Sequence, residues 1–141
     1  HTGTNKETAA QKNAGTLEVE YVPQGTLAER IRAYGAGLGG VLTPTGLGTI
    51  IQDGKQIVNV DGKDYILEKP LKADIAFLRA NIVDEDGNMV FLGTTQNFNP
   101  LMAMAADYVV VEAEKLVKRG EIAPENIHTS GIFVNGIYLE K

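Results

Sequence analysis

A glutamine at the junction between a strand-like segment and a helix-like segment has the best-placed polar chemistry in this chain. Gln24 follows Leu17 to Tyr21, where apolar residues alternate with glutamates as in a half-buried strand. Ligands of open α/β sheets bind at the carboxyl ends of strands, and a helix N-terminus offers unpaired N–H groups to an anion. A glutamine amide can donate to a carboxylate or thioester oxygen. On these residues alone, a plain turn residue is the favoured interpretation.

The segment after this glutamine is typical of a capped amphipathic helix. Thr26 stands three residues before Glu29, which is the spacing of a capping box. Apolar residues then recur at helical spacing, which predicts that one side of the helix is buried. We expect Thr26 to cap the helix, and the helix to end near Gly35 or Gly37.

A glycine-rich segment follows, with six glycines between Gly35 and Thr49. Ordering such a loop is entropically costly, and loops of this length in compact domains are more often functional than not. It is not a Walker A loop, because no Gly-Lys-Ser/Thr follows, nor a dinucleotide-binding fingerprint, because it follows a helix. We interpret it as a loop that lines a pocket, while a glycine helix cap explains Gly35 or Gly37.

The rest of the chain predicts an α/β domain over residues 1–141, with an open mixed sheet flanked by helices. The Asp-Gly pairs at 53–54 and 61–62 predict tight turns between short strands. Further strands are expected over residues 73–83, 88–92, 108–112 and 132–139. Asn99 before Pro100 predicts the start of a short helix, with Asn99 as its cap. Residues 113–120 are rich in charge and are expected to form a loop or a short helix.

Composition argues against several classes of function. The net charge is −5 and the 13 basic residues are scattered, so we expect no nucleic-acid partner. The longest apolar runs are too short to span a bilayer, so we expect no membrane partner. The chain has no cysteine, and the two histidines, His1 and His128, are far apart in sequence, so no metal site is expected and His128 is interpreted as structural. A cytoplasmic location fits these features.

Ordered motifs along nearly the whole chain resemble the first, alpha-type subunit of the family I coenzyme A transferases. The core of the resemblance is Pro23-Gln24-Gly25-Thr26-Leu27-Ala28-Glu29, then Gly35-Ala36-Gly37, then Thr43-Pro44-Thr45-Gly46-Leu47-Gly48-Thr49. Shorter matches are similar to the acetate/acetoacetate branch of the family; they lie at residues 3–5, 61–63, 73–74, 97–100 and 123–128. The resemblance implies the layered coenzyme A transferase fold.

The resemblance also implies an activity that this chain does not complete alone. Members move CoA from a short-chain acyl-CoA to a carboxylate by ping-pong chemistry through a glutamyl-CoA thioester, with CoA as substrate and no bound cofactor. The nucleophilic glutamate lies in a Ser-Glu-Asn-Gly motif of the second, beta-type subunit. The nearest match here, Pro124-Glu125-Asn126-Ile127, lacks the serine and the glycine. We therefore expect a hetero-oligomer in which a partner chain supplies the nucleophile.

The family's N-terminal glycine-rich turn, which helps to bind CoA, has no match in this chain. We therefore expect that the N-terminal portion of the family's subunit is missing here. Its absence would leave strand edges and apolar surface exposed. From this we expect the chain alone to be poorly soluble or to depend on association.

By resemblance, Gln24 positions the reacting carboxyl groups, and a set of further residues binds the substrate: Asn5, Gly25, Gly39, Gly40, Thr43 and Thr45. Gly25 could equally serve only the turn, and a structural turn competes for Thr43 and Thr45. The rival function is a non-catalytic, regulatory domain of the same architecture that binds a sugar phosphate.

Overall fold

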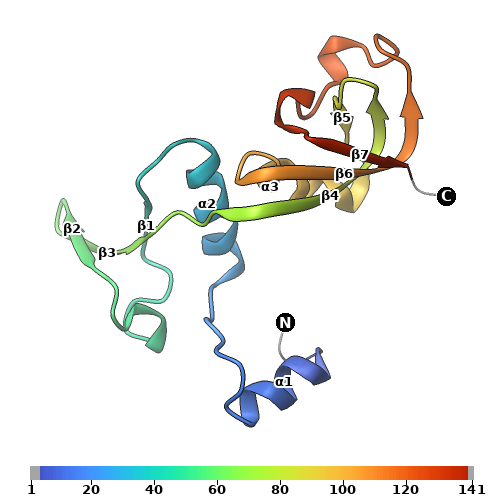
Figure 1. The fold of residues 1–141 in the computed structure, drawn as a ribbon. Coiled ribbons are helices and arrows are strands. Elements are labelled where there is room, and N and C mark those ends of the chain that lie inside the picture. Colours follow the sequence, from blue (N-terminus) through green and yellow to red (C-terminus); the bar gives the residue numbers. More distant parts are fainter. Residues whose placement is uncertain (1–3, 140–141) are drawn as a thin grey trace.

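A four-stranded mixed sheet forms the centre of the computed structural model, which describes residues 4–139 (Figure 1). Strands β4 (Ala73–Asp84), β6 (Ala106–Val117) and β7 (Gly136–Leu139) are parallel neighbours. Strand β5 (Met89–Val90) pairs antiparallel with β4, which gives the order β5-β4-β6-β7. The predicted open mixed sheet is therefore present.

The two long strands bury one face of this sheet. Alternate residues of β4 and β6 are buried together: Ala76, Leu78, Ala80, Val109, Val111 and Ala113. The short helix α3 (Asn99–Met102) ends beside Ala103, which joins the same core. On the opposite face, the paired residues Ile75 and Tyr108 are half exposed, and Phe77 is 73% exposed. Within the described residues, this part of the sheet is covered on one side only.

A smaller antiparallel sheet is formed by β1 (Val41–Thr43), β3 (Lys63–Glu68) and β2 (Ile57–Val60), in that order. The predicted turn at Asp61-Gly62 joins β2 to β3, and both residues have positive φ, 50° and 80°, as an Asp-Gly hairpin turn requires. The other Asp-Gly pair, at 53–54, does not join two strands. It follows a short 3₁₀ turn, Ile50–Gln52, so the strand expected there is wrong.

Helix α2 (Gln24–Gly35) lies between the two sheets, whereas α1 (Lys6–Asn13) stands apart from the rest of the fold (Figure 1). Helix α1 was not predicted from the sequence pattern, and it has no buried residue. The segment that joins the helices contains the expected strand Leu17 to Tyr21. That expectation is wrong, because the segment pairs with no described strand and Leu17 and Tyr21 are exposed. No helix within residues 4–139 is long and apolar enough to cross a membrane.

Three further expectations need correction. Residues 113–117 are not a loop, because pairing with β4 continues β6 to Val117. Asn99 does not cap α3 but is its first residue; its side chain accepts from the Arg79 N–H (3.1 Å) and donates to the Thr95 carbonyl (2.9 Å). The last strand begins at Gly136, because Gly131–Phe133 forms a 3₁₀ turn.

Candidate functional site

Helix α2 begins at Gln24, three residues earlier than the capping motif predicts, since that motif makes Thr26 the N-cap and Leu27 the first helical residue. Pro23 is the N-cap, and its carbonyl accepts from the Leu27 N–H at 2.9 Å. Thr26 is 5% exposed and makes no cap, so the expected capping box is wrong. Proline is tolerated at this position because a backbone N–H there would have no partner within the helix, so its absence costs no hydrogen bond, and the fixed φ of proline is compatible with a helix start. The first N–H groups of α2 thus have neither an intrahelical partner nor a side-chain cap.

A cleft of about 470 Å³ separates α2 from β1 beside this helix start. Residues from both elements and from the loop after β1 line it: Pro23, Gly25, Thr26, Glu29, Arg32, Val41, Leu42, Thr43 and Thr45. Three of the predicted substrate-binding residues, Gly25, Thr43 and Thr45, therefore meet in one cavity. Gln24 adjoins the cleft through its neighbours on both sides and is itself exposed.

The loop after β1 is held in a fixed turn at the rim of the cleft. The Thr45 N–H donates to the Thr43 hydroxyl (3.2 Å). The Thr43 side chain therefore stabilises the turn, and Thr43 also lines the cavity. Gly46 has φ of 98°, and a Cβ there would lie 2.6 Å from the Ile51 side chain. The glycine is thus required by both its backbone conformation and its packing.

The other predicted residues lie outside the cleft lining. Gly40 packs against β3, where an added Cβ would come within 2.9 Å of the Glu68 carbonyl oxygen. Gly39 has open space around it and does not line the cleft. Asn5 caps α1 by accepting from the Thr8 N–H at 3.0 Å. The structure therefore gives Gly40 and Asn5 packing and capping roles that the sequence motifs did not reveal.

One ion pair dominates the electrostatics of the cleft wall. The Nε and Nη2 groups of Arg32 both donate to Oε2 of Glu29, at 2.8 and 2.6 Å. The hydrogen bond from Arg32 holds the pKa of the Glu29 carboxyl below its usual value, and the same bond raises the pKa of Arg32. Both side chains remain about half exposed, so solvent screens the pair.

A second network of ion pairs and hydrogen bonds joins α2 to the small sheet outside the cleft lining, and the sequence motifs did not predict it. Glu68, at the end of β3, is only 2% exposed and accepts from Lys55 Nζ at 2.7 Å. Arg30 of α2 donates to Glu20 (3.0 Å) and to the Lys69 carbonyl (2.8 Å). These bonds tie the segment that enters α2 to the helix itself and to the small sheet. No sequence motif predicts these bonds, because the bonded residues are ten or more positions apart in the chain.

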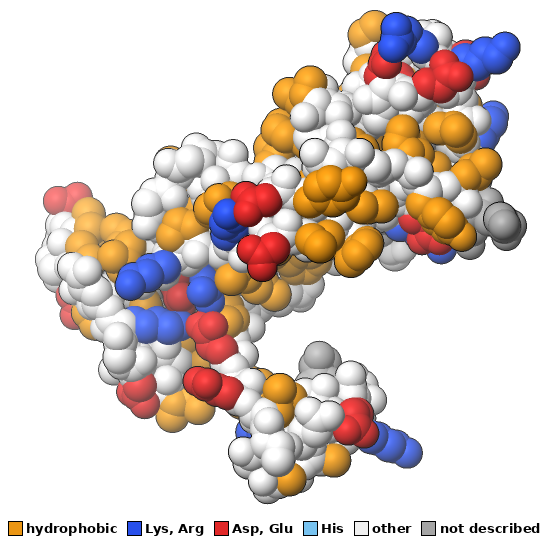
Figure 2. All heavy atoms as spheres, viewed as in Figure 1, with side chains coloured by type: hydrophobic (Ala, Val, Ile, Leu, Met, Phe, Trp, Pro, Cys, Tyr) orange, Lys and Arg blue, Asp and Glu red, His pale blue; other side chains and the backbone are white. Residues whose placement is uncertain are grey.

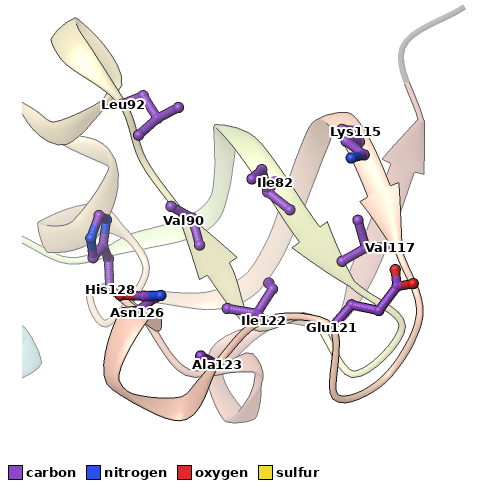
Figure 3. A pocket seen from close by; sticks show the side chains of 10 residues that line it. All are labelled: Ile82, Val90, Leu92, Lys115, Val117, Glu121, Ile122, Ala123, Asn126 and His128. Carbon is purple, nitrogen blue, oxygen red and sulfur yellow. The ribbon is translucent and has the colours of Figure 1, made fainter.

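A larger cavity, about 680 Å³, lies elsewhere, between the ends of β4, β5 and β6 and the loop 121–128 (Figure 3). Its middle is apolar, with Ile82, Val90 and Ile122 (Figure 3). His128 lies at one side, where Nδ1 accepts from the Phe91 N–H at 3.1 Å and the ring stacks on Phe91. These contacts support the structural interpretation of His128. His1 lies outside the described residues, and no group of three or more metal-ligating side chains occurs among residues 4–139.

Known proteins place the chain in a family. The family model for coenzyme A transferase matches residues 1–140. The acetate CoA-transferase subunit alpha of Escherichia coli K12 is 48% identical over 141 residues, which is 100% of this chain and 64% of that protein. The acetoacetyl-CoA:acetate/butyrate CoA transferase alpha subunit of Clostridium acetobutylicum is 53% identical over 138 residues, covering 98% of this chain and 63% of that one.

A solved acyl-CoA transferase from Escherichia coli O157:H7 superimposes with a TM-score of 0.83 at 22% identity, covering 94% of this chain and 30% of that chain. The chain belongs to the coenzyme A transferase family. The resemblance and the fold class expected from the motifs are thus confirmed. The chain spans 64% and 63% of the length of the two curated relatives named above.

Proposed function

We propose that this chain is part of the alpha-type subunit of a short-chain acyl-CoA transferase, with CoA as a substrate. The observation that carries the proposal is the cleft beside the start of α2. It brings Gly25 together with Thr43 and Thr45, which come from two separate family motifs. Relatives named for acetate, acetoacetyl-CoA and butyrate support a short-chain acid as acceptor.

The proposed reaction needs a nucleophile from a second, beta-type subunit. The partner's glutamate attacks the acyl-CoA carbonyl, which gives a mixed anhydride and CoA thiolate. The thiolate then attacks the glutamyl carbonyl of the anhydride, which forms a glutamyl-CoA thioester and releases the first carboxylate. The acceptor carboxylate then attacks the glutamyl-CoA thioester, and the same two exchanges in reverse release the new acyl-CoA and the free glutamate.

Each exchange passes through a tetrahedral intermediate with a negatively charged oxygen. Fixed donors aimed at that oxygen are worth most in such a site. In our proposal the Gln24 amide, together with the uncapped N–H groups at the start of α2, serves this purpose. A neutral amide suits the role because it can also position the carboxylate of the acceptor without neutralising it.

Gln24→Ala tests this role in the complex with a beta-type subunit. Because one oxyanion donor contributes about 10²- to 10³-fold, we expect kcat for CoA transfer to fall by roughly that factor. Gln56→Ala is the matched control, since Gln56 is also an exposed glutamine but neither it nor its sequence neighbours line the α2–β1 cleft. Wild-type transfer by the Gln24 variant would refute the assignment. Binding of a sugar phosphate by the chain without a partner would instead favour the regulatory-domain alternative.

A further inference from the structure

The cleft extends along α2 and has a cation in its wall well away from the helix start. Gly25, Glu29 and Arg32 are spaced by four and three residues, so they share one side of the helix. The helical rise puts Arg32 about 10 Å along the axis from Gly25. Val41 and Leu42 form the facing wall. The cavity thus combines a guanidinium group with an apolar surface.

The guanidinium of Arg32 already holds a carboxylate. Nε and Nη2 both bind one oxygen of Glu29, which is the side-on edge by which arginine receives carboxylates from ligands. The two side chains are 44% and 49% exposed. Exposed pairs of this kind contribute little to stability, so exchanging one carboxylate for another costs the fold little.

We propose that Arg32 receives the carboxylate of a ligand in this cleft, and that Glu29 occupies its place until the ligand arrives. The ligand class is a short-chain aliphatic carboxylate, which rests on the function proposed above. Because Arg32 lies about 10 Å along α2 from Gly25, this position holds the acid before the transfer step and is separate from the reacting position at Gln24. The alkyl part would lie against Val41 and Leu42.

The proposal predicts opposite effects for the two partners of one ion pair. Glu29→Gln removes the competing carboxylate, so butyrate should bind roughly two- to five-fold more tightly, the factor expected from an exposed pair. Arg32→Gln removes the charged donor, so butyrate should bind at least about tenfold more weakly. Arg32→Lys keeps the charge but loses the side-on edge and should lie between wild type and Arg32→Gln.

Butyrate binding is measured by saturation-transfer NMR, which observes the ligand and tolerates an associated protein. Asp86→Asn and Arg119→Gln are the matched controls, because this exposed pair lies in the turn regions after β4 and β6 and lines neither the cleft nor the larger cavity. Neither control should change the Kd for butyrate. Thermal unfolding of each variant verifies that it is folded.

Two results would overturn the inference. If Glu29→Gln and Arg32→Gln weaken binding alike, the pair has only a structural role in the cleft. If inorganic phosphate binds through Arg32 while butyrate does not, the cleft receives a phosphate and the carboxylate assignment is wrong. Loss of this inference leaves the proposed function standing as long as Gln24→Ala slows transfer, so the two failures are distinguishable.

Discussion

Two glycines in the loop after β1 show how backbone conformation and packing each restrict the residue type at a position. Gly46 and Gly48 both have positive φ, 98° and 73°, and both belong to the motif shared with the family. Only Gly46 is crowded, because an added Cβ would meet Cγ2 of Ile51 at 2.6 Å and its Cβ at 2.8 Å. Rotation of the isoleucine cannot relieve the contact with its own Cβ. Gly48 is therefore required only by its backbone conformation, whereas Gly46 is required by both its backbone conformation and its packing against Ile51.

We predict that Gly46→Ala destabilises the chain more than Gly48→Ala. The Gly48 variant should lose about 1 kcal/mol, the cost of a left-handed conformation with a side chain. The Gly46 variant should lose about 1–3 kcal/mol more, because it adds an overpacked contact to that cost. Urea unfolding of the two variants measures the difference. Equal losses would mean that Ile51 moves aside and that packing does not fix Gly46.

At the residue scale, the family motif predicts more than the physics of single side chains does. The resemblance named six substrate-binding residues. Gly25, Thr43 and Thr45 line one cleft, whereas Asn5, Gly39 and Gly40 do not. Local rules failed at Thr26 and Asn99, where both side chains were expected to cap helices. Thr26 is instead buried, and Asn99 binds Arg79 across the fold. A capping signal describes only local bonds, so it cannot foresee a partner 20 residues away.

At the scale of elements, the long strands β4 and β6 were predicted from the sequence, but the position where β6 ends was not. The apolar run 73–83 matches β4 within one residue. Strand β6 extends five residues beyond the expected end at 112, to Val117, because Lys115 and Val117 continue the ladder with β4. This stretch resembled a loop because Glu114, Lys115 and Leu116 are all exposed, so it has no alternation of buried and exposed residues that would indicate a strand. Helix α1 was missed because its sequence has no apolar stripe and none of its residues is buried.

The ion pair between Lys55 and Glu68 joins the 3₁₀ turn region to β3, and we predict that it is needed for the small sheet. Lys55→Met should cost about 3–5 kcal/mol, because it leaves the buried Glu68 carboxylate without its partner. Lys63→Met, at an exposed lysine of the same sheet, should have little effect. Urea unfolding gives the values. The double variant Lys55→Met with Glu68→Leu should recover most of the loss, and no recovery would contradict the explanation.

At the scale of the whole molecule, the mixed sheet presents an apolar face. Hydrophobic side chains gather on the surface over this sheet (Figure 2). They include Ile75, Phe77, Tyr108 and Tyr138, of which Phe77 is the most exposed at 73%. Contiguous apolar surface of this kind marks association sites in soluble proteins. The face agrees with the dependence on association that the sequence motifs predicted.

We predict that the purified chain associates in solution through this face. Phe77→Lys should shift the elution from a sizing column towards the monomer, because it places a charge at the most exposed apolar position of the sheet. Ile50→Lys is the control, since Ile50 is 76% exposed but lies in the 3₁₀ turn outside the mixed sheet. Light scattering on the eluting peak gives the mass. A monomeric wild-type chain would contradict the prediction.

The register of the mixed sheet also sets the order of events when the chain is made. The β2–β3 hairpin closes through two residues, whereas Ala73 of β4 must wait for Ala106 of β6, which is 106 − 73 = 33 residues later. At about 5–20 residues per second, a ribosome leaves β4 without its parallel neighbour for roughly 2–7 s. During that interval β4 is a bare edge with apolar side chains on both faces. The nascent chain therefore needs chaperone protection most between the synthesis of β4 and that of β6.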